Sequence, residues 1–541
     1  MTTYSRRALV LALSAAGVAA TLTAVVTPEA AHAGAPAVPA LDWRPCAEQA
    51  RTTDPTADPT ADPTAASTAA SAAASAAASG VAASAPASSP VQECAELPVP
   101  LDYRDPYGPQ LTLAVSRLRS ERPEARRGTL LYIPGGPGGS GVRQLGQKGD
   151  ALRKAMAGAY DLVSFDPRGV GGSTTASCDL DAEDRDLVNL RPWPGPGGDI
   201  TESVARSRRI ADACARNGGP VLRSLTTANE ARDIDRFRQA LGEEKLSAWG
   251  VSYGTYVGAV YAQEYPRHTD RWVLDSSGDP DPARVARGWA ANMAVGADDR
   301  FPDFAAWAAD PAREEEEPGL RLAERAEGVR PLFLALAAKL DREPKESTTP
   351  GTPLTGNRLR QALQNALYSD ASFPQLARII RAATDPAGKP VLPADLAQPL
   401  RDEDAAVTAA VICNDVRWPD SVPAYGRAVA ADRVRHPLTA GMPANAFACS
   451  FWKDAPVEKP PRITAEGPSN ILMIQNLRDP STPYSGALKM REALGDRARL
   501  VTLDHGGHSV YLGNGNACGD RTVTEYLTTG RRPARDTYCA D

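Results

Sequence analysis

Seven short apolar runs, separated by segments of helical character, constrain the fold of this chain more than any other feature. Each run is rich in β-branched or aromatic residues and is bounded by Gly, Pro or Asp. Several are continuously apolar rather than alternating, which is typical of strands buried on both faces of a parallel sheet. The runs are QLTLAVSRL, GTLLYIPGG, YDLVSFDPRG, KLSAWGVS, RWVLDSS, NILMIQNLRD and ARLVTLDHGG. With helical segments such as 226–242 between them, they predict an α/β fold with a mostly parallel, doubly wound sheet. Sites in such a sheet lie at the carboxyl ends of the strands.

One connection between these strands is far too long for a simple crossover. Residues 279–468 have mostly helical character before the run NILMIQNLRD resumes the sheet. We expect this insertion to form a helical cap, or lid, over the carboxyl ends of the strands. The core is then expected to consist of residues 93–278 and 469–541.

The N-terminal 33 residues have the features of a secretory signal peptide. Arg6 and Arg7 precede an apolar run over 8–26, and Ala31-His32-Ala33 matches the small-x-small pattern of a cleavage site. A transmembrane anchor is the alternative, although the alanine-rich run is only weakly hydrophobic. We expect a secreted, extracellular protein with no stable membrane association once residues 1–33 are removed.

The charge of the chain is acidic. Removal of residues 1–33 takes away two arginines and one glutamate, which changes the formal net charge from −6 to −7. Nucleic acid phosphates require a basic face, so an acidic mature chain argues against a nucleic-acid partner. The oligomeric state cannot be predicted from these features.

Eight cysteines in an exported chain indicate disulfide bonds rather than a metal site. The cysteines cluster into four pairs of neighbours along the sequence. No CxxC or clustered Cys/His spacing typical of metal ligation is present. We therefore expect no bound metal. The preferred pairs are Cys46–Cys94, Cys178–Cys214, Cys413–Cys449 and Cys518–Cys539.

The N-terminal segment 34–92 contains a low-complexity tract at about 51–90. Its DPTA repeats and Ala/Ser runs offer almost no large apolar side chain to bury, which predicts a disordered surface loop. If Cys46 and Cys94 are bonded, the tract is tied at its base, and its deletion should leave the fold intact.

The pentapeptide Gly250-Val251-Ser252-Tyr253-Gly254 is the one G-x-S-x-G sequence in the chain. It follows the strand-like KLSAW and leads into a helix-like segment, which is the context of a nucleophile elbow. In such a turn, side chains at the two glycine positions would collide with neighbouring backbone. Ser252 is therefore the candidate nucleophile, and the alternative is an ordinary loop hydroxyl.

A serine nucleophile needs a histidine base, and the chain has four histidines after residue 33. His268 follows the elbow helix too closely, and His436 falls inside the expected cap. His505 and His508 lie in VTLDHGGHSVY, just past the last expected strand, where a catalytic histidine loop belongs in the order Ser, acid, His. We favour His508, because Gly506 and Gly507 allow the backbone to turn sharply and present it.

The acid that orients the histidine should follow the preceding strand. NILMIQNLRD ends in Asp479, and Pro480 and Pro483 set a turn that directs its carboxylate toward His508. Asp504 is the rival, but a carboxylate four residues from His508 cannot easily reach the far ring nitrogen of the base.

An oxyanion hole requires backbone N–H groups directed at the developing negative charge. One should come from Tyr253, the residue after the candidate nucleophile, and another from the glycine-rich turn at Gly135 and Gly136. No GK[ST] follows this turn, so it is not a phosphate-binding loop. The nearby Asp166 and Arg168 are interpreted as part of a buried structural turn.

Together, these motifs resemble one enzyme family. GGPGGSG, DLVSFDPRGVGGS, WGVSYGTYVGAVYAQEYP, ICNDVRWP, DPSTP and GGHSVY are similar to motifs of the secreted tripeptidyl aminopeptidases, in the prolyl-aminopeptidase branch of the α/β-hydrolases. The resemblance covers about Cys94 to Cys539 and implies an α/β-hydrolase fold and a serine exopeptidase. Ser252, Asp479 and His508 match that family's nucleophile, acid and base. Pro134 stands where the HGGPG pattern of prolyl aminopeptidases has a histidine. This difference favours a tripeptidyl aminopeptidase over a prolyl aminopeptidase.

An aminopeptidase must also bind the substrate ammonium group with a carboxylate at a fixed distance from the serine. Asp415, in VICNDVRWP, is the candidate, because a Cys413–Cys449 bond would anchor its loop. A purely local capping or ion-pairing role for Asp415 is the alternative.

The sequence thus predicts a secreted serine exopeptidase that releases short peptides, with tripeptides favoured, from free N-termini of peptide substrates. The mechanism requires no cofactor. A secreted esterase or lipase has the same triad, and the triad does not separate the two. A binding protein that retains the fold without chemistry is a third reading, disfavoured because serine, acid, histidine and glycine turn occur together.

Overall fold

The computed structural model describes residues 39–46, 91–281 and 287–540. The proposed signal peptide and the low-complexity tract lie outside the described residues. Among the residues that are described, none of the helices combines the length and apolar character that a membrane span requires.

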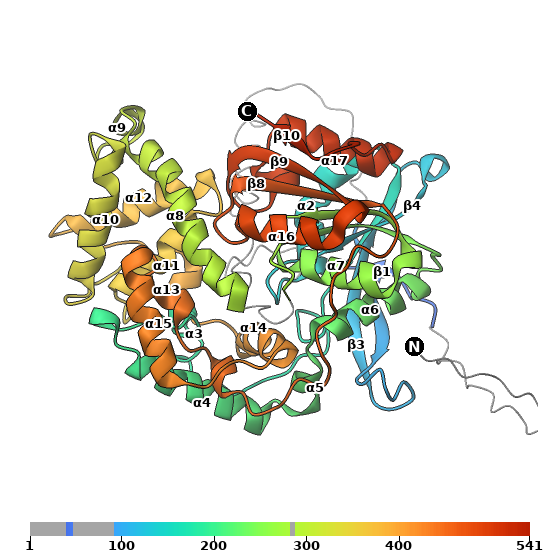
Figure 1. Ribbon diagram of the computed structural model, residues 1–541, viewed down its shortest axis with the longest axis horizontal. Coiled ribbons are helices and arrows are strands. Elements are labelled where there is room, and N and C mark those ends of the chain that lie inside the picture. The colour runs from blue at the N-terminus through green and yellow to red at the C-terminus, as the bar shows by residue number, and fades with distance from the viewer. Residues whose placement is uncertain (1–38, 47–90, 282–286, 541) are drawn as a thin grey trace, which may run out of the picture. The chain divides into compact units, whose positions relative to one another are not determined.

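One ten-stranded sheet forms the centre of the core, in the order β1-β2-β3-β5-β4-β6-β7-β8-β9-β10 (Figure 1). Pairing is parallel from β5 through β4 and on to β10, and it is antiparallel among β1, β2, β3 and β5. The strands are β1 (Arg44–Pro45), β2 (Glu93–Pro100), β3 (Gln110–Leu118), β4 (Gly128–Ile133), β5 (Tyr160–Phe165), β6 (Leu246–Val251), β7 (Thr269–Asp275), β8 (Ile471–Arg478), β9 (Ala498–Gly506) and β10 (Thr537–Cys539).

All seven apolar runs form strands, so the predicted mostly parallel α/β sheet is confirmed. Three strands were not predicted: β1 and β10 are very short, and β2 contains Pro98 and Pro100. Proline cannot donate to a strand ladder, and its presence argues against a strand unless that strand lies toward an edge. β2 is next to the edge strand β1, which accounts for its prolines.

Helices cover both faces of the sheet. The apolar side chains of α2 (Gly141–Met156) and α17 (Ala517–Thr529) belong to the hydrophobic cluster of one face. Those of α6 (Thr227–Ala240), α7 (Tyr253–Glu264) and α16 (Tyr484–Leu494) belong to that of the other. Each large apolar side chain that is fully buried in such a layer contributes about 1.5–3 kcal/mol relative to exposure.

The connection between β7 and β8 is helical, as predicted, and we call its helices the cap. In Figure 1 they gather on the left of the sheet. They are α8 (Arg287–Ala309), α9 (Ala312–Glu316), α10 (Ala326–Leu340), α11 (Gly356–Ala366), α12 (Phe373–Thr384), α13 (Ala394–Ala397), α14 (Asp402–Asp415) and α15 (Val422–Arg435), followed by the short 3-10 helix η8 (Ala448–Phe451).

A second insertion, between β5 and α6, also contributes to the cap layer. Helices α3 (Leu187–Leu190), α4 (Thr201–Asn217) and α5 (Gly219–Ser224) contact α11, η8 and α14 respectively. We expected residues 93–278 to belong to the core alone, and the structure differs here. α3 and α5 are short, and the longer α4 is amphipathic, so the sequence does not indicate which layer buries their apolar side chains.

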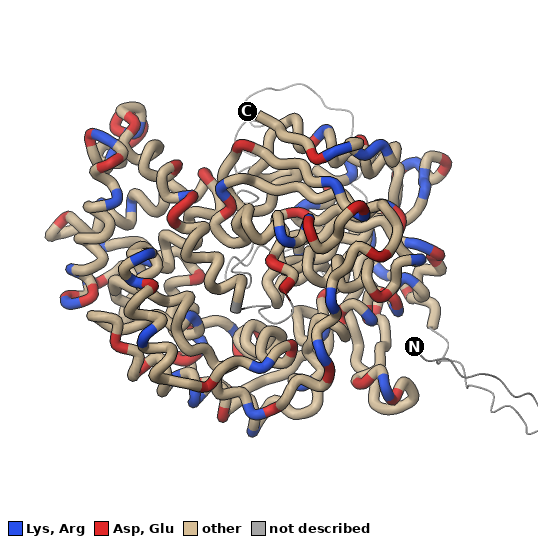
Figure 2. Tube along the Cα trace, viewed as in Figure 1, with Lys and Arg blue, Asp and Glu red and all other residues tan. Residues whose placement is uncertain are grey.

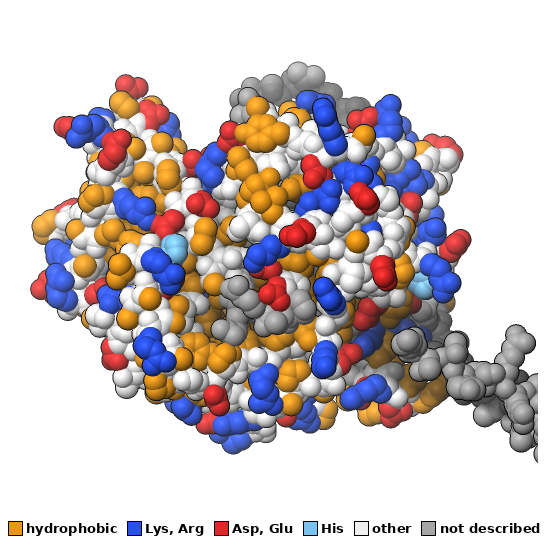
Figure 3. All heavy atoms as spheres, viewed as in Figure 1, with side chains coloured by type: hydrophobic (Ala, Val, Ile, Leu, Met, Phe, Trp, Pro, Cys, Tyr) orange, Lys and Arg blue, Asp and Glu red, His pale blue; other side chains and the backbone are white. Residues whose placement is uncertain are grey.

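The four disulfides are Cys46–Cys94, Cys178–Cys214, Cys413–Cys449 and Cys518–Cys539, so the predicted pairing is confirmed. Disulfides persist in oxidising compartments. Figure 2 shows positive and negative residues interspersed along the elements of core and cap, and Figure 3 shows charged side chains distributed between hydrophobic ones on the visible face.

Candidate active site

Ser252 lies on the sharp turn between β6 and α7, at the carboxyl edge of the sheet. Its backbone has φ 57° and ψ −123°, which is strained for a residue with a side chain. The side chain is nearly buried, with 7% of its surface exposed. The turn therefore holds the Ser252 hydroxyl in a fixed position ahead of the first turn of α7.

The two glycines that flank this turn are required by close backbone approach. A Cβ on Gly250 would lie 2.5 Å from the Gly254 carbonyl oxygen. A Cβ on Gly254 would lie 2.4 Å from the Ile133 carbonyl oxygen at the end of β4. These distances are far below van der Waals contact, so the predicted reason for the G-x-S-x-G spacing is confirmed.

The glycine-rich turn after β4 packs directly against Ser252. A Cβ on Gly135 would lie 3.0 Å from Ser252 Cβ and 3.5 Å from Ser252 Oγ. Tyr253 is the first residue of α7, so its N–H is one of the unbonded donors at a helix N-terminus, where the helix dipole favours negative charge. Gly135, Gly136 and Tyr253 thus come from two segments that meet at the serine.

Asp479 follows β8 directly and is completely buried. Its Oδ1 accepts the N–H groups of Ser481 and Thr482 at 2.9 and 2.8 Å, and its Oδ2 accepts the Thr482 hydroxyl at 3.0 Å. These donors fix the plane of the carboxylate. No signal in the sequence identified Thr482, although it lies within the DPSTP motif.

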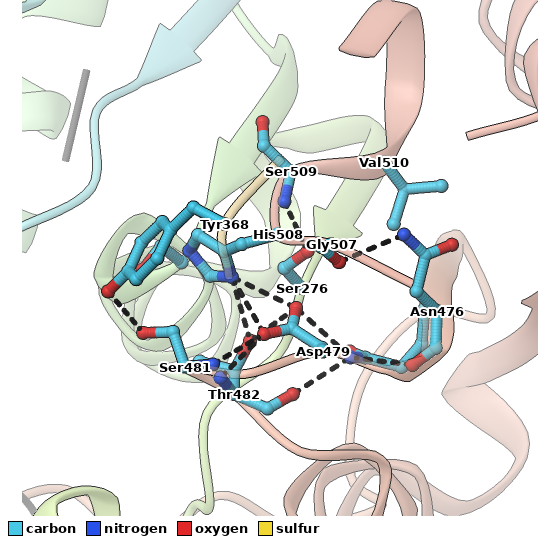
Figure 4. Close-up of polar contacts among 12 residues, drawn as sticks. Ser276, Tyr368, Asn476, Asp479, Ser481, Thr482, Gly507, His508, Ser509 and Val510 are labelled. Atoms are coloured by element: carbon cyan, nitrogen blue, oxygen red, sulfur yellow. Dashed lines mark hydrogen bonds and ion pairs between the residues drawn. The ribbon is translucent and has the colours of Figure 1, made fainter. Parts of the chain in front are cut away.

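His508 lies on the loop after β9 and faces Asp479 (Figure 4). Its Nδ1 is 2.9 Å from Oδ2 and 3.0 Å from Oδ1 of Asp479, and 4% of its surface is exposed. The Tyr368 ring lies edge-on against the imidazole with centroids 5.0 Å apart, and the His508 N–H donates to the Tyr368 carbonyl. The cap thus provides one wall of the histidine site, and that contact was not predicted.

The rival histidines and the rival acid have other partners. His268 Nδ1 is 2.8 Å from Asp235, and His436 Nδ1 is 2.6 Å from Asp298. Asp504 pairs with Arg478 at 2.7 Å and accepts the Tyr538 hydroxyl. The Arg478 contact lowers the pKa of Asp504 below its ordinary value. His505 belongs to β9, rather than to the loop after the strand where we expected it.

The cap lies against both loops that flank Ser252. A Cβ on Gly138, in the glycine-rich turn, would lie 3.4 Å from Val407 of α14. A Cβ on Gly296 of α8 would lie 2.5 Å from the carbonyl oxygen of Pro480, in the loop after Asp479. Cap helices therefore contact the carboxyl edge of the sheet on both sides of Ser252.

Asp415 ends α14 and caps the N-terminus of α6. Its Oδ1 accepts the Thr227 N–H at 2.9 Å, and its Oδ2 accepts the Thr227 hydroxyl. Burial raises the pKa of Asp415 to about 6, and these hydrogen bonds oppose the rise. The local capping role is therefore present. Each carboxylate oxygen retains a second lone pair, so capping does not prevent a further donor from binding.

A second buried carboxyl group, Glu230, is joined to Asp415 through two hydroxyl groups. The Thr227 hydroxyl lies 2.8 Å from the Tyr253 hydroxyl, which donates to Glu230 Oε2 at 3.2 Å. Burial raises the pKa of Glu230 to about 8, and Oε1 has no hydrogen-bond partner among the described residues. Sequence analysis missed Glu230, because nothing in its helical segment distinguishes it from a surface glutamate.

Asp415 also lies at a surface pocket of about 480 Å³. The opposite wall is the irregular segment Pro456–Pro460, which lies in the connection between the cap and β8. This segment is held to α6 by two contacts of Glu458 with Arg232, at 2.6 and 2.7 Å. Asp415 is therefore within reach of a small ligand.

The turn that follows β5 has a structural role next to the glycine-rich turn. Asp166 accepts the Ser140 hydroxyl at 2.7 Å and the N–H groups of Val142 and Gly172. Arg168 forms a buried ion pair with Asp233 of α6 at 2.6 Å. These contacts agree with the interpretation of Asp166 and Arg168 as parts of a buried structural turn.

Comparison with known proteins agrees with this geometry. A family model described as "TAP-like protein" matches residues 437–539, and one described as "alpha/beta hydrolase fold" matches residues 128–318. The tripeptidyl aminopeptidase of Streptomyces lividans is 34% identical over 470 residues, which cover 83% of each chain. Serine protease Hip1 of Mycobacterium tuberculosis is 28% identical, covering 82% of this chain and 87% of the relative. Carboxylesterase B of Mycobacterium tuberculosis is 30% identical, covering 83% and 86%. The chain therefore belongs to the tripeptidyl aminopeptidase family of the α/β-hydrolases.

Proposed function

We propose that the chain is a secreted serine aminopeptidase that releases short peptides, with tripeptides favoured, from free N-termini of peptide substrates. The observation that carries the proposal is the hydrogen bond between His508 Nδ1 and buried Asp479, in a site where Ser252 occupies a strained elbow. A buried carboxylate bonded to the Nδ1 of a histidine is the acid–base pair that a serine triad requires, and it supports the assignment of Ser252 as the nucleophile.

In the proposed mechanism, Ser252 Oγ attacks the carbonyl carbon of the scissile peptide bond while His508 Nε2 takes the hydroxyl proton. Asp479 accepts the Nδ1–H of His508, which fixes the tautomer and stabilises the imidazolium. The N–H of Tyr253 and the N–H groups of the turn at Gly135 and Gly136 bind the oxyanion.

Collapse of the tetrahedral intermediate breaks the peptide bond and leaves the N-terminal peptide as an ester on Ser252. His508 gives its proton to the leaving amine, which departs with the rest of the substrate. Water, deprotonated by His508, then attacks the ester and releases the short peptide.

Asp415 and Glu230 are proposed to bind the ammonium group of the substrate. Both carboxyl groups are buried, and neither takes part in an ion pair among the described residues. Glu230, whose pKa of about 8 keeps it protonated at neutral pH, offers the ammonium group a neutral acceptor. The charge is supplied by Asp415, and a buried carboxylate without a contacting cation is costly unless a ligand supplies one. Tyr253, which follows Ser252, links this carboxyl pair to the elbow and so sets its distance from the scissile bond.

Secretion is part of the proposal. It is supported by residues 1–33, which have the pattern of a signal peptide, and by four disulfides, which persist in oxidising compartments. Comparison of the N-terminus of the protein purified from culture medium with the cleavage predicted after Ala33 tests it. Retention of residues 1–33 on a cell-associated protein would contradict it.

An esterase remains the second candidate, because a relative that is 30% identical is named carboxylesterase B. The test uses three substrates: a tripeptide p-nitroanilide with a free amino group, the same compound N-acetylated, and p-nitrophenyl acetate. We expect efficient cleavage of the free-amine peptide, much weaker cleavage of its acetylated form, and loss of both in Ser252→Ala. Cleavage of the ester alone would support the esterase.

A further inference from the structure

The end of β7 makes hydrogen bonds with all three loops that carry the proposed catalytic residues. We call residues Asp275, Ser276 and Ser277 the β7 terminus. All three are completely buried, and the mechanism above uses none of them. Ser276 has φ 61°, an uncommon conformation for a residue with a side chain, so the surrounding structure determines its backbone.

The first contact is with the nucleophile. The N–H of Ser252 donates to the carbonyl oxygen of Asp275 at 3.0 Å. This bond continues the parallel pairing of β6 with β7 to the residue that carries the hydroxyl. The position of Ser252 along the sheet is therefore fixed relative to Asp275.

The second set of contacts is with the loop that carries His508. The Ser509 N–H donates to Ser276 Oγ at 2.9 Å, as Figure 4 shows. The Val510 N–H donates to Asp275 Oδ1 at 2.8 Å, and the Tyr511 N–H donates to Asp275 Oδ2 at 2.9 Å. Three consecutive backbone N–H groups after the histidine are thus bound by two adjacent side chains.

The third contact is with the segment that carries Asp479. The Ser277 N–H donates to Gln475 Oε1 at 2.8 Å. Gln475 Nε2 donates in turn to the Thr482 carbonyl at 2.8 Å and approaches Asp479 Oδ2 at 3.4 Å. The β7 terminus therefore contacts the nucleophile directly, the base through one residue, and the acid through Gln475.

Asp275 is chemically suited to this arrangement because its four partners are all donors. Besides Val510 and Tyr511, Trp249 Nε1–H donates to Oδ2 at 3.1 Å, and the Ser276 hydroxyl donates to Oδ1. Burial raises the pKa of Asp275, and these donors oppose the rise by stabilising the carboxylate. An amide of the same size offers only one acceptor oxygen, so it cannot satisfy both backbone N–H groups and the indole.

We propose that Asp275 and Ser276 are positioning residues, which set the distance between His508 and Ser252 by binding the N–H groups of residues 509–511. The inference rests on the proposed function, since it explains how His508, the base of the proposed mechanism, is held in place. The two residues do not touch substrate, so they act only through the histidine loop.

Asp275→Asn and Ser276→Ala test the proposal in the full-length protein. Complete labelling with a fluorophosphonate counts the reactive sites, and kcat for the free-amine tripeptide anilide is expressed per labelled site. We expect kcat per site to fall about 10- to 100-fold in Asp275→Asn and about 10-fold in Ser276→Ala, because a displacement of about 1 Å can cost that much. KM should stay within about twofold of wild type, because ammonium binding does not involve this loop.

Trp249→Phe is the matched control, because it removes one donor to the same carboxylate but none of the hydrogen bonds to residues 509–511, and it keeps an aromatic ring against Tyr511. It is expected to lower the melting temperature but to keep kcat per site within about threefold of wild type. An equal loss of kcat in Trp249→Phe and Asp275→Asn would overturn the proposal. A wild-type value of kcat per site in both Asp275→Asn and Ser276→Ala would also overturn it. If Asp275→Asn does not fold, Ser276→Ala decides alone. Failure of the fluorophosphonate to label Ser252 in the wild type would instead remove the proposed function.

Discussion

Asp415 is the carboxylate that we propose to bind the ammonium group of the substrate. Replacement of its carboxylate by an amide keeps an acceptor for Thr227 but removes the negative charge. A charge-assisted hydrogen bond contributes about 1.5–3 kcal/mol, so KM for the free-amine tripeptide anilide should rise about 10- to 100-fold in Asp415→Asn. Activity on p-nitrophenyl acetate should not change.

Asp395 provides the control for this substitution. It is another cap carboxyl group whose pKa burial raises to about 6, and it bonds to Asn365 rather than to α6. Asp395→Asn should leave KM unchanged for every substrate. Equal effects of Asp415→Asn on the free-amine peptide and on the ester would remove Asp415 from the ammonium site.

The pH dependence of ligand binding follows from the pKa of Asp415. Below about 6 this carboxyl group is protonated and cannot pair with an ammonium ion, so affinity for a free-amine tripeptide should fall as the pH decreases through 6. Calorimetric titration of Ser252→Ala measures the binding affinity directly. Because this variant does not turn over the peptide, the pH dependence of the catalytic steps does not enter the measurement. An affinity that is unchanged between pH 5 and 7 would contradict the assignment.

Glu230 stabilises the folded protein less as the pH rises. Its folded-state pKa of about 8 is above the ordinary value of 4.5, so the folded protein binds this proton more tightly than the unfolded chain. Stability from this group is fully present below about 4.5 and is lost as the pH rises through about 8. The melting temperature of Glu230→Gln relative to wild type should therefore increase between pH 5 and 8. The exposed control Glu466→Gln should show no such trend, and a flat difference for Glu230→Gln would contradict the prediction.

At the scale of the secondary-structure elements, close backbone approach constrains the turn between β6 and α7. In Gly254→Ala the new Cβ would lie 2.4 and 2.6 Å from the carbonyl oxygens of Ile133 and Pro134, so α7 must move away from the turn that follows β4. We expect kcat to fall by about 100-fold or more, since the oxyanion donors come from both segments.

Gly426→Ala, inside α15, is the matched control for that prediction. Its Cβ would meet nothing closer than 3.7 Å, and alanine in a helix is about 0.5–1 kcal/mol more stable than glycine. Wild-type kcat and an unchanged or raised melting temperature are expected. Full activity in Gly254→Ala would show that the elbow is not tightly packed.

The parts of the site that lie at strand ends could be predicted from the sequence, because each has a local signal. Ser252 is flanked by glycines between a strand and a helix, Asp479 ends an apolar run, and His508 follows two glycines. Glu230 and Tyr368 have no such signal, and Asp275 ends the apolar run RWVLDSS without any motif that assigns it a role. Their roles depend on which side chains the folded chain brings against them, and single-sequence patterns do not contain those contacts.

At the scale of the whole molecule, the main unpredicted feature is that two separate insertions build the cap layer. The insertion between β7 and β8 was evident from its length. By contrast, the sequence did not distinguish α3, α4 and α5 from crossover helices of the core. The same limitation applies to β10, whose three residues pair with β9 and are joined to α17 by the Cys518–Cys539 bond.

The low-complexity tract is expected to be dispensable. The Cys46–Cys94 bond and the pairing of β1 with β2 join the chain on either side of it. Deletion of residues 51–90 should leave kcat and KM unchanged and the melting temperature within a few degrees. Cys46→Ser in the same deletion variant should lower the melting temperature, because a disulfide contributes about 2–4 kcal/mol. Loss of activity on deletion of the tract alone would assign it a role in catalysis or folding.

The central claim is that Ser252 is the nucleophile, that His508 activates it, and that a free amino group directs the substrate to it. The most direct measurement is peptide mapping by mass spectrometry after reaction with a tripeptidyl phosphonate diphenyl ester that has a free N-terminus. We expect one adduct, on Ser252, which forms far more slowly in His508→Ala and with an N-acetylated reagent. An adduct on another residue, or equal labelling in His508→Ala, would contradict it.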